Sequence, residues 1–101
     1  MGEDRRLRAV VELAQARTDL ETARAQFAAT RLNVAEAEEA FRLATLRFAR
    51  GLSTQLDVSD AQLALATART NEARATHELY LAAAGLARAQ GRPIPLLPAA
   101  P

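Results

Sequence analysis

The chain has 101 residues, which is enough for one small domain and short for an enzyme pocket supported by a packed core. Half of the residues are hydrophobic, yet only 4% are aromatic, and alanine (25) and leucine (15) are the most frequent types. Alanine buries little surface, so a compact globular core would be weak, whereas a chain rich in Ala, Leu, Arg and Glu favours long helices or a coiled coil. Four glycines and four prolines are too few for the many tight turns of an all-β protein.

Charge and cysteine content exclude further classes of protein. Thirteen basic residues, all arginine, nearly balance twelve acidic ones, which argues against a nucleic-acid partner. The absence of cysteine excludes disulfides, thiol catalysis and Cys-ligated metals. The start of the chain has no apolar segment typical of a signal peptide, and the longest apolar run, residues 79–87, is far shorter than the roughly 18 residues of a membrane span. We therefore expect no direct membrane insertion by this segment.

The first predicted element is a helix over residues 4–50, which contain neither glycine nor proline. Gly51 can adopt the left-handed conformation that ends a helix. Thr54 is suited to cap the next helix, and Asp57 completes a capping box three residues later. Because the connection is so short, the second helix, residues 55–90, is expected to run antiparallel to the first.

The second helix is expected to end at Gly91, since Pro93 cannot continue it. The predicted organisation is a helical hairpin over 1–92, made of helix 4–50, tip 51–54 and helix 55–90, followed by a flexible Pro-rich tail over 93–101.

Apolar residues recur every seven positions along both helices, as in a left-handed coiled coil. The repeat of the first helix comprises Leu13, Leu20, Phe27, Val34, Phe41 and Phe48. The repeat of the second helix comprises Val58, Leu65, Glu72, Leu79 and Leu86, each followed after three residues by an alanine. If the chain folds back at Gly51 so that paired residue numbers sum to 102, each apolar layer joins one large residue to one small one, and Thr30 faces Glu72. We call this pairing the 102 register.

A second apolar set lies away from this seam: Leu32, Leu43, Leu46, Leu56, Leu63 and Tyr80. A two-helix hairpin alone would leave these side chains in water, so we expect them to contact further helices, from other copies or from another part of the parent chain. The alternative is a scatter of surface residues. The predicted fold class is therefore all-α, a long antiparallel two-helix coiled-coil hairpin that associates into a four-helix or larger bundle.

No catalytic, cofactor or metal site is predicted. His77 is the only histidine, and we interpret it as a solvated helix residue. Asp57 and Asp60 share one face of the first turn of the second helix; capping explains Asp57 well and Asp60 less well. Repeated around a symmetric ring, the pair would form an acidic collar that attracts cations. Glu72, in the seam, either specifies the register or is satisfied by a neighbouring helix or by water.

The stretch FARGLSTQLDVSDAQL, residues 48–63, resembles the outer-membrane efflux protein family, the TolC-like channels. The shared pattern is an aromatic residue, two residues and a glycine, then a polar turn, then Asp-Val-x-Asp-Ala-Gln and a leucine. The similarity continues to LARAQG at residues 86–91 and is best over 35–92.

The resemblance implies a trimeric outer-membrane channel without enzymatic activity or cofactors, whose long periplasmic tunnel is built from helical hairpins. Such channels export drugs, metals or proteins together with a periplasmic adaptor protein and an inner-membrane pump. The chain is similar to the lower part of the family's second repeat, a periplasmic portion of an outer-membrane protein, here as a fragment without its β-barrel. By position, the resemblance assigns an adaptor-docking tip and a pair of aperture-lining residues: Arg50, Gly51, Leu52, Ser53 and Thr54 for the tip, and Asp57 and Asp60 for the aperture.

Two departures from the family concern tip closure. Phe48 and Ser53 stand where the best-studied member uses a tyrosine hydroxyl and an arginine. Two other functions also stay open. One is the hairpin of a periplasmic adaptor (membrane fusion) protein, although the Arg–Leu–Ser spacing of its tip is absent. The other is a soluble coiled-coil module that forms homodimers or higher homo-oligomers by burying the second apolar set.

Overall fold

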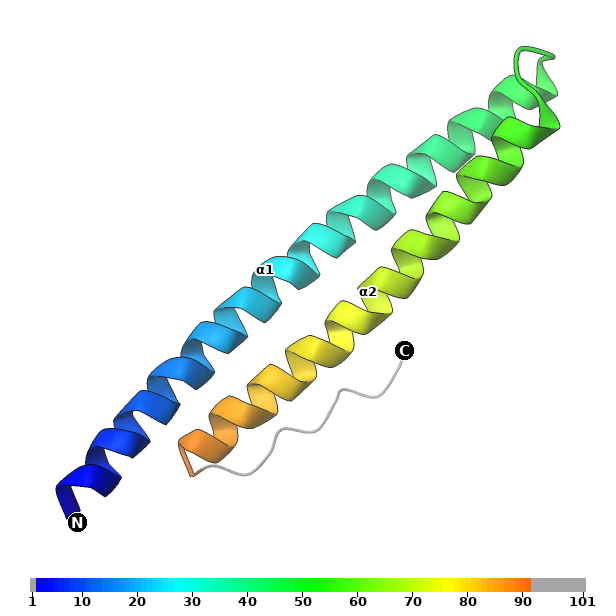
Figure 1. The fold of residues 1–101 in the computed structure, drawn as a ribbon. Helices are drawn as coiled ribbons and strands as arrows, with labels where there is room; N and C mark the ends of the chain where they lie inside the picture. Colours follow the sequence, from blue (N-terminus) through cyan, green and yellow to red (C-terminus); the bar gives the residue numbers. More distant parts are fainter. Residues whose placement is uncertain (1, 92–101) are drawn as a thin grey trace. The chain divides into compact units, whose positions relative to one another are not determined.

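Two long helices make up the structure, a computed structural model that describes residues 2–91 (Figure 1). Helix α1 spans Gly2–Ala49, helix α2 spans Gln55–Ala89, and no strand occurs within the described range. The expected all-α fold of two long helices is confirmed. Its local cause is a composition of strong helix formers, uninterrupted by proline in either helix. The tail expected over 93–101 lies outside the described residues.

The start of α1 differs slightly from the expected one. The helix begins at Gly2 rather than near residue 4, which places Glu3 and Asp4 inside its first turn. Carboxylates at that end interact favourably with the free N–H groups and the positive end of the helix dipole. At the other end α1 stops at Ala49, because Arg50 already belongs to the turn.

A glycine-dependent C-cap ends α1. Gly51 has φ of 72°, the left-handed conformation expected from the sequence. The N–H of Leu52 donates to the carbonyl of Arg47 at 2.8 Å, and the N–H of Gly51 donates to the carbonyl of Phe48 at 3.0 Å. These two bonds form a Schellman motif, which satisfies carbonyls that the helix end would otherwise leave unpaired.

A capping box begins α2, as the sequence predicts. The Thr54 hydroxyl oxygen accepts a hydrogen bond from the N–H of Asp57 at 3.1 Å. In return, Oδ2 of Asp57 accepts from the N–H of Thr54 at 3.2 Å. The first bond of the α2 backbone then runs from the N–H of Val58 to the carbonyl of Thr54 at 3.3 Å. The chain therefore reverses between two caps that are built from local residues alone.

The chain divides into two compact units. The tip unit is residues 27–75; the terminal unit combines residues 1–26 with 76–101, of which 2–26 and 76–91 are described. Within the tip unit, the end of α1 and the start of α2 pack along the predicted seam. Its core is a cluster of buried side chains with half-buried neighbours: Val34, Leu65 and Ala68, packed against Ala37 and Phe41.

This cluster supports the 102 register in the tip unit. The register pairs Val34 with Ala68 and Ala37 with Leu65, and all four residues meet in the one cluster. A shift of one heptad would instead set Val34 opposite Ala61 or Ala75. Large side chains thus pack against small ones, which allows close approach of the two helices.

The terminal unit follows the same seam. Leu20 and Ala23 are buried, and their register partners Ala82 and Leu79 are half-buried. Ala84 and Ala87 are buried as well, at positions that the heptad pattern does not assign to the seam.

Two seam predictions are wrong at the ends of the hairpin. Phe48 is 44% exposed, because its register partner is Thr54, which lies in the turn before α2 begins. Ala89, the last residue of α2, is exposed too. Phe48 is exposed because no helix lies opposite it, whereas the exposure of Ala89 has no such explanation, since its register partner Leu13 lies within α1.

Candidate functional site

The tip unit contains every residue that the sequence assigns to a functional site. Four of the five tip residues are exposed and Ser53 is half-buried, and Leu52 is 72% exposed. The N–H of Arg50 is shared between the carbonyls of Leu46 and Arg47, both at 3.2 Å, so this residue takes part in the turn through its backbone. Leu56 is exposed as well, so the tip presents two large apolar side chains and the exposed Arg50 to solvent.

Asp57 is held within the capping box. Besides the Thr54 N–H, its Oδ2 accepts a hydrogen bond from the Ser53 hydroxyl at 3.0 Å. The Thr54 N–H, then the Ser53 and Thr54 side chains, and more weakly the charge of Arg47, lower the pKa of Asp57 below its ordinary value. The carboxylate is therefore kept ionised by contacts that also fix the turn.

Asp60 has a different environment from Asp57. It is exposed and lines a groove of about 510 Å³ in the tip unit, whose other walls are small, amide and apolar side chains: Asn33, Leu63, Ala64, Thr67, Ala68 and Asn71. Sequence reasoning treated the two aspartates as a pair. The structure separates a carboxylate that is used by the cap from one that opens onto a groove.

Two rows of leucines lie away from the seam in the tip unit. On α1 the row comprises Leu32, Leu43 and Leu46; on α2 it comprises Leu56 and Leu63. All five are exposed, Leu63 to 67% and Leu46, the least exposed, to 38%. The expectation that a hairpin leaves them in water is confirmed. Tyr80, the remaining member of the predicted set, lies in the terminal unit and is half-buried.

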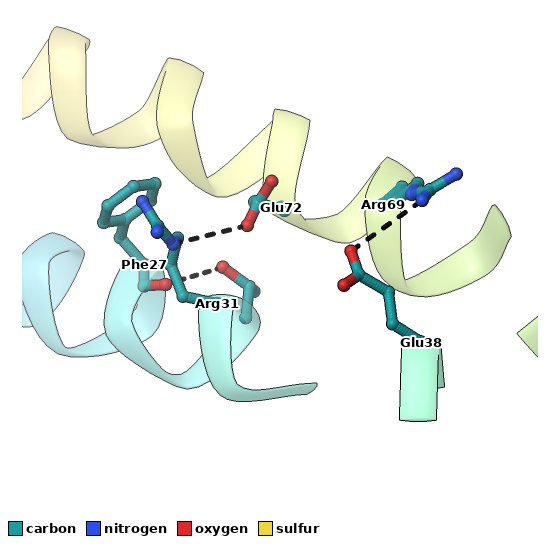
Figure 2. A network of polar contacts seen from close by, with 6 residues as sticks. Phe27, Arg31, Glu38, Arg69 and Glu72 are labelled. Carbon is teal, nitrogen blue, oxygen red and sulfur yellow. Dashed lines mark hydrogen bonds and ion pairs between the residues drawn. The ribbon is translucent and has the colours of Figure 1, made fainter. Parts of the chain in front are cut away.

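Ion pairs bridge the two helices along one side of the tip unit (Figure 2). Arg31 Nε lies 3.8 Å from an oxygen of Glu72, and Arg69 lies 3.7 Å from an oxygen of Glu38. The Arg31 guanidinium also sits 5.9 Å from the ring centre of Phe27, within range of a cation–π contact. The neighbouring helix of the hairpin therefore provides a partner for Glu72.

Thr30 does not use its hydroxyl across the seam, since the group donates to the carbonyl of Phe27 on its own helix at 2.7 Å. Sequence analysis missed Arg31 and the Glu38–Arg69 pair. The signal was present, because opposite charges flank the seam at neighbouring levels of the 102 register.

Residues 2–91 contain neither a metal-binding cluster nor a membrane-spanning helix. No group of three or more His, Asp or Glu side chains there is arranged to hold a metal ion. In the same range, neither helix has an apolar stretch of the length that a membrane crossing requires.

Comparison with known proteins identifies the family. The model of the outer membrane efflux protein family matches residues 2–92. No curated protein and no solved structure matches the chain. The family consists of transport channels rather than enzymes; its members are associated with the outer membrane, have periplasmic helical domains, form trimers and work with adaptor proteins. With that match over both helices and the turn between them, the chain belongs to the outer membrane efflux protein family.

Proposed function

We propose that this hairpin is a segment of the periplasmic helical tunnel of an outer-membrane efflux channel. In this role it acts as a wall element of a conduit, part of a larger protein that also contains the membrane barrel, and it has no enzymatic activity. The family match supports the channel, and the distribution of apolar side chains supports the role as a wall.

The observation that carries the proposal is the presence of an exposed leucine row on each helix, away from the seam. A hairpin that docked onto one partner would need one such row. Rows on both helices suit a hairpin with a neighbour on each side, because each row then packs against a further helix. Repetition of that arrangement closes a ring of helices, which is the wall of a tunnel.

Assembly of the full-length channel that contains this segment tests the proposal. Leu63→Glu places a charge in the α2 row and should convert trimers to monomers on size-exclusion chromatography with light scattering. Ala66→Glu is the matched control, since it adds the same charge at an exposed position outside the rows and should leave the trimer intact. Trimers that survive Leu63→Glu would contradict the proposed wall.

The tip is proposed to dock the periplasmic adaptor through Arg50, Gly51, Leu52, Ser53 and Thr54. The exposed Leu52 and the closely defined backbone of the turn support this role. Gly51→Val forces a branched side chain into a left-handed conformation, so the turn should change and adaptor binding should weaken. Unchanged adaptor binding and export would show that the tip is not part of the docking surface.

Asp57 and Asp60 are proposed to line the periplasmic aperture, where a ring of carboxylates would attract cations. Asp60 is the better test of the two, because Asp57→Ala would also disrupt the cap. Asp60→Ala should reduce block of the channel by divalent cations, and the double substitution should reduce it further. Equal block in wild type and both variants would exclude the aperture role.

Self-association of the isolated hairpin is a second candidate function, favoured by the same leucine rows. Two hairpins that pack these rows together would form a four-helix bundle. Light scattering over a range of concentrations should then give a mass above the 10.9 kDa of one chain. A helical monomer at all concentrations would contradict self-association of the isolated hairpin, and assembly would then occur only in the full-length channel.

A further inference from the structure

We infer which side of the tip unit faces the lumen of the tunnel. Asn33 of α1 with Asp60, Thr67 and Asn71 of α2 form the inner wall, and the side that carries the Arg31–Glu72 and Glu38–Arg69 ion pairs forms the outer wall. This inference rests on the proposed tunnel function, and it adds the direction in which the wall curves.

The first argument is the spacing of the two apolar stripes on α1. In each heptad, a single position lies between the seam and the leucine row on one side of the helix; these residues are Asn33, Ala40 and Arg47. Two positions lie between seam and row on the other side, and they include Arg31, Ala35, Glu38 and Arg42. The stripes are therefore closer together across the Asn33 side.

This asymmetry determines towards which side the wall of helices curves. A helix in a closed ring contacts two neighbours, and the angle between those contacts is smaller on the inside of the ring than on the outside. If the seam and the leucine row are the two contacts, the narrower arc must face inwards. On α2 the row of Leu56 and Leu63 lies opposite its seam, so the two arcs of α2 are equally wide. The direction of curvature is therefore determined by α1 alone.

The second argument is the lining of the same side, since grooves of about 510 Å³ lie on both sides and differ in their side chains. The groove of about 510 Å³ opens there, with Asn33 from α1 and Asp60, Thr67 and Asn71 among its α2 walls. Ala64 contributes a small side chain to the same wall. Small and neutral polar side chains suit the crowded inner arc of a ring, and they leave a wetted surface that passing solutes can slide along.

The third argument is the placement of charge pairs. The Arg31–Glu72 and Glu38–Arg69 ion pairs between the helices of the tip unit lie on the wider arc of α1, at 3.8 and 3.7 Å, with their side chains partly exposed. On the narrow arc, Asn33 and Asn71 occupy the corresponding flanking positions. The two sides therefore differ chemically: one has amides between isolated charges, which include Asp60 and Arg47, and the other is crosslinked by paired charges.

Single cysteines test the assignment in the full-length channel. The chain has no cysteine of its own, so Asn33→Cys, Asn71→Cys, Ala35→Cys and Ala73→Cys each place one thiol per copy of the segment. The members of each pair are two residues apart on the same helix, point to opposite sides, and are all exposed, so the alanine positions are matched controls. A charged, membrane-impermeant methanethiosulfonate reagent is added while conductance is recorded in a planar bilayer.

We expect the reagent to reduce conductance stepwise for Asn33→Cys and Asn71→Cys. Ala35→Cys and Ala73→Cys should react, as mass spectrometry would show, without a change of conductance. Block through the alanine positions, equal block at both sides, or no reaction at Asn33 and Asn71 would each overturn the assignment. A protein that neither forms trimers nor conducts would overturn the tunnel function itself, so the two failures are distinguishable.

Discussion

Leu63 and Leu65 lie two positions apart on α2 and have opposite surroundings. Leu65 is 9% exposed in the tip-unit core, whereas Leu63 is 67% exposed on the outer row. The same side chain therefore stabilises the hairpin in one place and is free for assembly in the other. The comparison shows that hairpin folding uses only one stripe of each helix, and that the second stripe has no structural role until another helix covers it.

The largest expected effect separates these two leucines. Leu65→Ala should lower the free energy of unfolding of the hairpin by about 2–3 kcal/mol, because it removes buried methyl groups and leaves a cavity. Leu63→Ala should change it by less than about 0.5 kcal/mol, as expected for an exposed site. Urea unfolding at one fixed, low protein concentration measures both, since association would add stability. Equal losses would show that the outer row is already covered in the isolated chain.

The next effect concerns two glycines with different backbones. Gly51→Ala should destabilise the hairpin by about 1–2 kcal/mol, because φ of 72° strains any L side chain. Gly85→Ala should stabilise it by up to about 1 kcal/mol, because this residue is inside α2 and an added Cβ meets nothing within 4 Å. Thermal unfolding followed by circular dichroism gives the sign of each change. Destabilisation by Gly85→Ala would indicate that this glycine is needed for a close helix contact.

A smaller effect is expected at the Thr54–Asp57 capping box, where α2 begins. Thr54→Ala should cost about 1 kcal/mol of stability, as for other N-cap residues. The cap also predicts a pH dependence. Since folding lowers the pKa of Asp57, its contribution is complete above the unfolded-state pKa and is lost as pH falls through the lower folded-state value.

Stability of the wild type should therefore fall on acidification more steeply than that of Asp57→Asn, which has no carboxylate to protonate. Urea midpoints between neutral and acid pH compare the two proteins. Parallel curves would mean that Asp57 does not couple protonation to the cap.

The smallest effect is expected from the ion pairs beside the seam. Glu38→Gln should change stability by no more than about 0.5 kcal/mol, because Glu38 and Arg69 are largely exposed. A double-mutant cycle with Arg69→Gln, at low and high salt, isolates the pair, and its coupling should decrease with salt. A large coupling that persists at high salt would show that these charges, rather than the apolar layers, hold the register.

Much of the fold could be predicted from residues that act locally. The two helices, the left-handed Gly51 and the Thr54–Asp57 capping box follow from backbone preferences and short-range hydrogen bonds. The seam was predictable because large and small residues alternate at heptad spacing, and only one register sets Val34 against Ala68 and Leu65 near Ala37. The exposed leucines were predictable from the same heptad pattern, because they occupy positions away from the seam.

The sequence by itself determined that this chain makes two helices and reverses at Gly51, since those features depend on neighbours along the chain. Only the tertiary structure decided that Phe48 lies beyond the end of the seam, that Arg31 reaches Glu72, and that Asp60 opens onto a groove. These outcomes depend on which residues of the opposite helix stand at the same level, and heptad spacing fixes the stripe of contact without fixing the partners of each side chain.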